Sequence, residues 1–328
     1  MRADLAWTLG PALIQPYSTP HPYQFPDSAF PVLAGIAPAA NASAPQRLMF
    51  WTDGATFRAE GYPAPGSFPV SVDPPSPVLG SGPNGSYDGN GNWLLAAFRL
   101  GGAASAELVG FAHTENHVWR CPGGGHGEWN SGAVLRSADD GRSWSREGLA
   151  ISDPQPCNAT FGGAGFSSVV PARGRLGSGF LGFGGCGAFW SGDARGSAGS
   201  WMRWNGSAFS EPGVNGSTAQ RCLPGVPGNV CCPIVHFNTY LRAHVVVYTK
   251  WGQGSTLFIA AATDEEGLAW GPSAVLLDVG PGSSVAYGQI IGAENSTHAG
   301  RNATLVYALA PPTSGQPRDF VARSIVFE

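Results

Sequence analysis

The fold is decided by the stretch Ser137-Ala138-Asp139-Asp140-Gly141-Arg142-Ser143-Trp144. It follows the Asp-box pattern S-x-D-x-G-x-x-W, whose residue types suit the turn of a β-hairpin. The Asp and Ser side chains bond backbone groups of the turn, the Gly supplies a positive φ, and the Trp packs back on the sheet. We therefore expect Asp139 and Asp140 to be turn residues at the rim of a sheet, not catalytic groups.

A degraded copy of this stretch occurs later in the chain, as Thr263-Asp264-Glu265-Glu266-Gly267-Leu268-Ala269-Trp270. Each copy follows an apolar strand, Gly132–Ser137 or Leu257–Thr263, and precedes a second one. A hairpin unit that recurs in this way is typical of radial repeats such as propellers.

The composition favours a protein of many turns and few helices. The chain of 328 residues contains 48 Gly and 28 Pro, and only 12% of its residues are charged. Gly and Pro at this level also occur in disordered chains, but 43% hydrophobic residues and 11 Trp favour a packed core. Apolar strands separated by turns predict an all-β fold, which we expect to be a five-bladed β-propeller of four-stranded antiparallel blades.

We expect one domain, residues 1–328. The blades are predicted at residues 20–80, 85–155, 160–215, 230–280 and 284–328, with the strand at Leu5-Ala6-Trp7 completing the fifth.

Charge and hydropathy exclude two classes of partner. A net charge of −4 without basic blocks predicts no nucleic-acid binding. No apolar run reaches the roughly 20 residues that span a bilayer, so we expect no membrane insertion. Residues 1–7 do not show the charged start and apolar centre of a signal peptide.

Glycosylation and cysteine signals nevertheless predict a secreted protein. We also expect it to be a monomer. Seven Asn-x-Ser/Thr sequons suggest surface glycans, and six cysteines could form up to three disulfides. We expect the adjacent cysteines to bond to two different partners; a zinc site is the competing hypothesis. The sequons are Asn41, Asn84, Asn158, Asn205, Asn215, Asn295 and Asn302, and the cysteines are Cys121, Cys157, Cys186, Cys222, Cys231 and Cys232.

Three segments carry residues suited to sugar chemistry, and the first surrounds two acids. Asp27 follows Pro26 among aromatic residues, and Asp53 follows Trp51. An acid on a first strand suits a catalytic base or nucleophile, and Trp51 suits sugar stacking. The other interpretation is that Asp27 and Asp53 are turn residues.

The second segment is Leu108–Trp119, whose alternation places Phe111, His113 and Glu115 on one face. A carboxylate beside an imidazole and aromatic rings is predicted to have a raised pKa, as a general acid requires. The alternatives are a surface His/Glu pair and a metal site at His113 and His117, which has no third ligand at suitable spacing.

The third segment is Pro233–Leu241, in which His236, Asn238 and Tyr240 share one face. Imidazole, amide and aromatic groups together suit a saccharide subsite. The other interpretation of His236 is a hydrogen-bonded core residue.

These segments resemble the five-bladed propeller glycosidases, a group that includes glycoside hydrolase families 32, 43, 62 and 68, and in particular uncharacterised secreted proteins of this fold. The resemblance rests on Phe25-Pro26-Asp27, on residues 110–115 before the Asp-box, on residues 162–168 and on residues 235–241. It implies Asp27 as base or nucleophile, Glu115 as general acid and inverting chemistry.

In the same group a third acid assists catalysis, a role that Asp53 could take. Glu211 is a reserve candidate for the acid. The resemblance implies no required cofactor, and a structural Ca²⁺ near His236 is a further hypothesis.

Two rival functions remain open from the sequence. A non-catalytic carbohydrate-binding propeller would keep the aromatic and amide residues without a working acid pair. A sialidase would need an arginine cluster to hold a carboxylate, for which Arg58, Arg99 and Arg242 are available.

Overall fold

The computed structural model describes residues 5–15, 32–36, 46–52, 55–60, 77–83, 86–101, 105–120, 126–153, 161–216, 221–293, 295–310 and 318–328. Within these ranges every regular element is a β-strand apart from one short 3-10 helix, η1 (Gly174–Leu176). The prediction of an all-β protein is therefore confirmed. None of the described helices is long and apolar enough to cross a membrane.

The strands form five sheets, four of which have five strands and one of which has three. The first sheet contains β3 (Val32–Ile36), β4 (Gln46–Thr52) and β5 (Thr56–Glu60). The second contains β6 (Gly91–Arg99), β7 (Leu108–Arg120), β8 (His126–Ser137), β9 (Ser145–Ile151) and β10 (Phe161–Gly163). The third contains β11 (Ser168–Pro171), β12 (Phe180–Gly184), β13 (Gly187–Ser191), β14 (Trp201–Trp204) and β15 (Phe209–Pro212).

The last two sheets complete the set. The fourth contains β16 (Val230–Asn238), β17 (Ala243–Lys250), β18 (Gln253–Ala261), β19 (Ala274–Asp278) and β21 (His298–Ala299). The fifth contains β20 (Ser284–Ile291), β22 (Asn302–Ala310), β23 (Asp319–Phe327), β1 (Trp7–Leu9) and β2 (Leu13–Gln15). The N-terminal strand joins the C-terminal sheet as predicted, because Trp7 pairs with Phe327.

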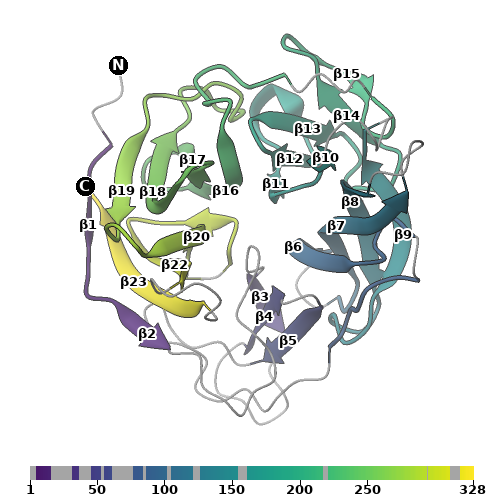
Figure 1. Ribbon diagram of the computed structural model, residues 1–328, viewed down its shortest axis with the longest axis horizontal. Coiled ribbons are helices and arrows are strands. Elements are labelled where there is room, and N and C mark those ends of the chain that lie inside the picture. Colours follow the sequence, from purple (N-terminus) through teal and green to yellow (C-terminus); the bar gives the residue numbers. More distant parts are fainter. Residues whose placement is uncertain are drawn as a thin grey trace.

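The five sheets lie around a common centre, which β3, β6, β11, β16 and β20 approach most closely (Figure 1). Contacts connect β20 with β16, β16 with β11, β11 with β6, and β6 with β3. Among the described residues no comparable contact connects β3 with β20, so these strands do not form a closed ring. The prediction of uniformly four-stranded antiparallel blades is wrong, since β10 and β21 add parallel strands beside β8 and β16.

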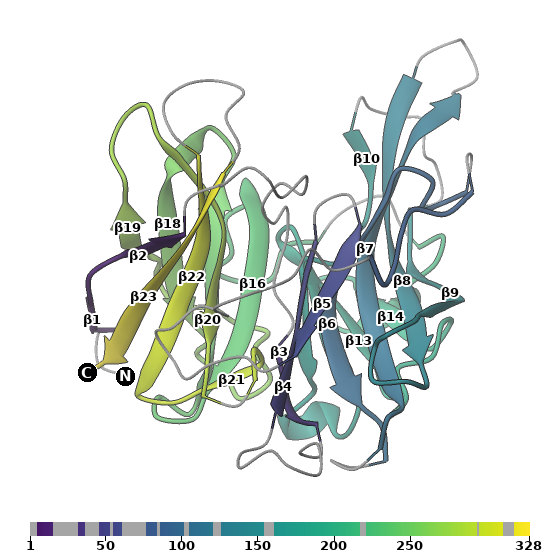
Figure 2. The same ribbon diagram turned by 90° about the horizontal axis from the view of Figure 1, so that it is seen from below.

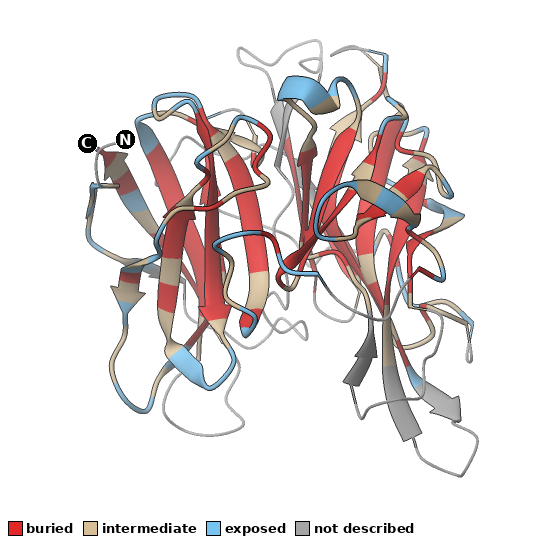
Figure 3. Cartoon of the chain, turned by 90° about the horizontal axis from the view of Figure 1, so that it is seen from above, coloured by how far each residue is buried: buried red, intermediate tan, exposed pale blue. Residues whose placement is uncertain are grey.

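The core lies between the sheets, where the alternating strands bury their apolar faces (Figure 3). Between the second and third sheets, Phe111, Phe166 and Trp201 are almost fully buried and pack ring against ring. Their ring centroids lie 4.9 to 6.1 Å apart. Aromatic pairs of this kind stabilise beyond their buried area and fix the two sheets against each other.

The turn between β8 and β9 is built from the opening stretch. The Ser137 hydroxyl accepts a hydrogen bond from Gly141 N (2.8 Å), and Asp139 Oδ1 accepts one from Ser143 N (2.9 Å). Gly141 has a φ of +75°, and the Trp144 indole packs edge-on against Phe50 with ring centroids 5.7 Å apart. Ser137 and Asp139 therefore serve the turn and are not part of a catalytic site.

The second copy forms the turn between β18 and β19. Asp264 Oδ1 accepts hydrogen bonds from Gly267 N and Leu268 N, both at 2.9 Å, and Gly267 has a φ of +80°. Trp270 is buried against Phe183 of the third sheet.

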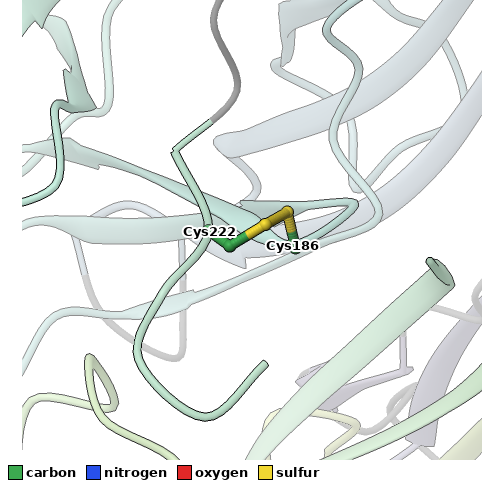
Figure 4. The surroundings of a disulfide bond; sticks show 2 residues. All are labelled: Cys186 and Cys222. Carbon is green, nitrogen blue, oxygen red and sulfur yellow. A yellow bond between two sulfur atoms is a disulfide. The ribbon is translucent and has the colours of Figure 1, made fainter. Parts of the chain in front are cut away.

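One disulfide is present in the described part of the chain, between Cys186 and Cys222 (Figure 4). It ties the β12–β13 turn to the segment before Leu223, whose side chain is buried in the core between the third and fourth sheets. Cys121 and Cys157 lie outside the described residues.

The two ends of the molecule can be told apart by β10 and β21, which lie at opposite ends in Figure 2. We call the end that carries β10 the upper end and the end that carries β21 the lower end. β6 begins at the upper end, since Gly91 pairs with Glu115 and Glu115 pairs with Asn130 beside β10. β16 finishes at the lower end, where Asn238 pairs with Ala299.

Candidate functional site

The candidate site is a polar group on β7 at the upper end. His113, Glu115 and His117 alternate along this strand, so their side chains point to the same face. Opposite them on β6, Trp93 pairs with His113 and Gly91 pairs with Glu115. A side chain on Gly91 would collide with the Trp93 indole, so glycine at this position leaves room for the ring.

Glu115 is held between the two imidazoles. His113 Nε2 donates to Oε1 at 3.1 Å, and His117 Nε2 donates to Oε2 at 2.5 Å. The Glu115 side chain is 18% exposed, whereas that of His117 is 45% exposed. The carboxylate is thus largely screened from water but can be reached beside His117.

The pKa of Glu115 lies below its usual value. Burial raises this pKa, but the hydrogen bonds and charges of His113 and His117 together outweigh burial and lower it. The predicted raised pKa is therefore wrong, because the alternation places a second imidazole against the same carboxylate. A lowered pKa favours the ionised carboxylate, which suits a base or a nucleophile better than a proton donor.

Two neighbours complete the surroundings of this group. Gly165, which precedes the third sheet, lies directly against the His113 ring: a Cβ built there would lie 2.2 Å from Nδ1. Asn130 on β8 pairs with Glu115, and its Oδ1 is buried with no hydrogen-bond partner among the described residues. Sequence reasoning missed both, and only the strand register identifies Asn130 as a neighbour of the carboxylate.

The acids of the first segment, Asp27 and Asp53, lie outside the described residues, as does the side chain of Trp51. Thr52 and Thr56, which flank Asp53 in sequence, pair with each other at the end of β4. The Thr56 hydroxyl donates to Asn92 O at 3.2 Å, and Asn92 follows Gly91 on β6. The end of β4 therefore lies at the upper end, beside the start of β6.

The start of β3 lies toward the same end, because β3 is antiparallel to β4, with Val32 paired with Met49 and Ile36 paired with Gln46. Asp27 precedes this strand by five positions in the sequence.

Asn238 and Tyr240 of the third segment lie at the lower end, away from Glu115. Asn238 is fully buried and accepts hydrogen bonds from Tyr240 N (3.0 Å) and Leu241 N (2.9 Å). Its amide also donates to Gly300 O at 3.2 Å. The Asn238 amide thus holds the turn after β16, and Tyr240, 46% exposed, lies beyond it.

His236 is a core residue. It is almost fully buried, and its pKa falls to about 3 because burial disfavours the charged ring and His244 and His298 lie nearby. The structure therefore does not bring the third segment together with Glu115.

The arginines proposed for a sialidase also lie away from Glu115. Arg99 ends β6 at the lower end and pairs with Asp140 at 2.5 Å, and Arg58 Nε donates to Asp140 O at 2.8 Å. Arg242 follows Asn238 in the lower-end turn. These three side chains do not form a carboxylate clamp at the site.

The described residues contain no group of three or more His, Cys, Asp or Glu side chains placed to hold a metal ion. A structural Ca²⁺ near His236 therefore remains a prediction from resemblance.

No protein-family model matches this chain, and no curated protein matches it significantly. Similar solved structures include an N-acetylgalactosamine deacetylase from F. plautii in complex with blood group B trisaccharide, at 12% identity over 99% of this chain and 96% of that one (TM-score 0.49). They also include the catalytic domain of a family 62 α-L-arabinofuranosidase from Coprinopsis cinerea, at 11% identity over 98% and 97% (TM-score 0.42).

A protein of unknown function from Dyadobacter fermentans is similar at 12% identity over 98% and 99% of the two chains (TM-score 0.43).

Proposed function

We propose that this protein is a secreted glycoside hydrolase with its active site at the upper end of the molecule. The observation that carries the proposal is the ionised Glu115 held between His113 and His117. Glycosidases work with a pair of carboxyl groups on either side of the scissile bond. Glu115 supplies one of them, and the first sheet contributes the segments that flank Asp27 and Asp53 at the same end.

The fold that fits this proposal is a five-bladed propeller formed by residues 1–328 as one domain. The five sheets around a common centre and the order of contacts between their inner strands support it. In a propeller, one end of the inner strands collects residues from several blades. A site at this end could therefore combine Glu115 of the second sheet with residues of the neighbouring first sheet.

The state of Glu115 reverses the roles that the resemblance implies. Because its pKa is lowered, Glu115 is the carboxylate that activates water as a general base. Asp27 is then the general acid, and Asp53 tunes it. We propose inverting chemistry, for which the two carboxyl groups stand roughly 6.5–9.5 Å apart with a water between them.

The substrate is a plant, algal or microbial polysaccharide or oligosaccharide. His117 and Asn130 beside Glu115 offer donors and an acceptor for sugar hydroxyls. Secretion is supported by the Cys186–Cys222 disulfide and by the exposed sequon residues Asn215 and Asn302. We propose that the protein acts as a monomer and needs no metal for this chemistry.

A panel of arabinan, xylan, fructan and galactan tests the proposal, with wild type compared with Glu115→Gln. Glu147→Gln is the matched control, because Glu147 lies on the outer strand β9 and its two oxygens also accept hydrogen bonds, from Arg136 and from Ala198 N. We expect the wild type and the control to release product and Glu115→Gln to release none while remaining folded, with a lower melting temperature because the charge-assisted hydrogen bonds are weakened. Product release by Glu115→Gln would exclude Glu115 as a catalytic group.

A carbohydrate-binding protein without catalysis is the second candidate, and one observation favours it. Both oxygens of Glu115 already accept hydrogen bonds, so the group could serve only to orient donors toward a bound sugar. Binding of a polysaccharide without product release, weakened by Glu115→Gln, would establish this function in place of hydrolysis.

A further inference from the structure

The first residues of β16 contain two adjacent cysteines, Cys231 and Cys232, at the upper end of an inner strand. Their Sγ atoms lie 2.7 Å apart. Unbonded heavy atoms keep a distance of about 3.5–4.0 Å, whereas bonded sulfurs lie about 2.0 Å apart. The two sulfurs are therefore already closer than ordinary contact allows.

The backbone at this point is bent to bring the sulfurs together. Neighbouring side chains on a regular strand point to opposite faces, which would separate two adjacent cysteines. Here the pairing of β16 with β17 shifts register between Cys231 and Ile234, and Cys232 has a φ of +54°. This left-handed conformation is uncommon for a residue other than glycine, and it turns both sulfurs to one side.

The surroundings favour reaction of Cys231. Its pKa is lowered, because the hydrogen bond with Cys232 outweighs burial, and Thr249 and Arg318 add to the effect. A lowered pKa increases the fraction of thiolate, which is the form that attacks a disulfide.

We propose that Cys231 and Cys232 form a vicinal disulfide in the mature protein. The oxidant is a low-molecular-weight or protein disulfide of an oxidising compartment. The Cys231 thiolate attacks one sulfur of that disulfide, its S–S bond breaks, and one thiolate leaves. The Cys232 thiol then loses its proton, attacks Cys231 Sγ and releases the second thiolate. The protein loses two electrons and two protons, and the oxidant becomes two thiols.

This bond differs from the Cys186–Cys222 bridge in its effect on the stability of the protein. The latter joins residues 36 positions apart, and in the chain-entropy account a disulfide stabilises more when it closes a longer loop. A bond between adjacent residues restricts the unfolded chain very little. The vicinal disulfide therefore fixes the local shape of β16 at the upper end and makes a minor contribution to global stability.

Peptide mapping tests this inference without any enzymatic assay. The secreted protein is denatured without reductant, alkylated, deglycosylated and digested with trypsin. Residues 222–242 form one tryptic peptide, and residues 176–195 form another that contains Cys186. We expect these two peptides joined by one bridge, with no alkyl group and with a mass two hydrogens below that of the dithiol form.

A Cys232→Ser variant is the matched control, in which Cys231 should gain one alkyl group while the bridge to Cys186 persists. Two alkyl groups on residues 222–242 of the wild type would overturn the proposal. So would a cross-link to residues 121–136 or 147–173, the peptides that contain Cys121 and Cys157. These outcomes are independent of whether the protein cleaves sugars.

Discussion

Gly165→Ala is a small change that tests the site directly. Gly165 has no positive φ, so alanine fits its backbone and only the new methyl group matters. That methyl would lie 2.2 Å from His113 Nδ1, whereas ordinary contact begins at 3.4 Å. The imidazole must therefore move by about 1.2 Å, the difference between these distances, which disrupts its 3.1 Å hydrogen bond to Glu115.

The magnitude follows from that lost bond. A hydrogen bond to a charged group contributes about 1.5–3 kcal/mol, and about 1.4 kcal/mol corresponds to a tenfold change in rate. We expect kcat/KM on the polysaccharide identified by the panel to fall roughly 10- to 100-fold. Overpacking should also lower the free energy of unfolding by about 1–3 kcal/mol.

Gly228→Ala is the matched control, because no atom lies within 4 Å of a Cβ built there. A second test repeats Gly165→Ala in a His113→Ala background, where the added methyl meets no imidazole. The loss of stability should then nearly vanish, giving a coupling free energy of about 1–3 kcal/mol, equal to that loss. If Gly165→Ala lowered the free energy of unfolding equally in the wild-type and His113→Ala backgrounds, the steric account would be refuted. If Gly165→Ala had the same kcat/KM as Gly228→Ala, the position of His113 would not matter for catalysis.

Three further predictions concern pH and stability. Because the pKa of Glu115 is lowered, the carboxylate loses its charge only at a pH below the usual pKa of Glu, and the acid limb of the kcat/KM profile should lie there. His117→Gln removes one cause of the lowering and should move this limb to higher pH. An unmoved limb would contradict the assignment of Glu115 as base. The pKa of Asp139 is lowered to about 2, since hydrogen bonds from Ser143 and Ser137 outweigh burial. As the pH falls from 4 to 2, the wild type should therefore lose about 1 kcal/mol of its free energy of unfolding, after allowance for solvent screening. Urea titrations should show the same loss in the control variant Asp278→Asn and no such loss in Asp139→Asn. Asn238→Ala should lower the free energy of unfolding by about 2 kcal/mol or more and leave kcat/KM unchanged, because Asn238 holds a turn at the lower end. A lower kcat/KM measured where the variant is fully folded would instead place Asn238 in the active site.

Much of the architecture could be predicted because turn chemistry is local. The β8–β9 turn and its copy between β18 and β19 depend on residues within eight positions, and the structure shows their side chains bonding the turn backbone. The joining of the strand at Leu5-Ala6-Trp7 to the C-terminal sheet was also predicted, and the pairing of Trp7 with Phe327 agrees with it. The parallel strands β10 and β21 were missed, because two or three residues beside a neighbouring sheet leave no periodic pattern.

The site was less predictable because its properties depend on register and on several neighbours at once. His113 and Glu115 were identified from alternation, but the direction of the Glu115 pKa shift depends on the balance between burial and two imidazoles. Gly165 reaches His113 from another sheet, and no local pattern shows this contact. The expectation that Cys231 and Cys232 bond to two different partners stays a prediction, because Cys121 and Cys157 lie outside the described residues. The positive φ of Cys232 could not be predicted from the sequence.

The position of the third segment could have been derived from strand order alone. In an antiparallel sheet each connection lies at the end opposite to the preceding one. The β8–β9 and β18–β19 turns each join the third strand of a sheet to the fourth. They therefore lie at the same end as the turn between the first and second strands, which Asn238 holds in the fourth sheet. Glu115 approaches the connection between second and third strands and must lie at the other end, with the segments that precede each first strand. The same rule assigns Gly165 and the cysteine pair to the end of Glu115, because each precedes or begins a first strand. The turns that connect the strands therefore also indicate which end of the sheets is available for chemistry.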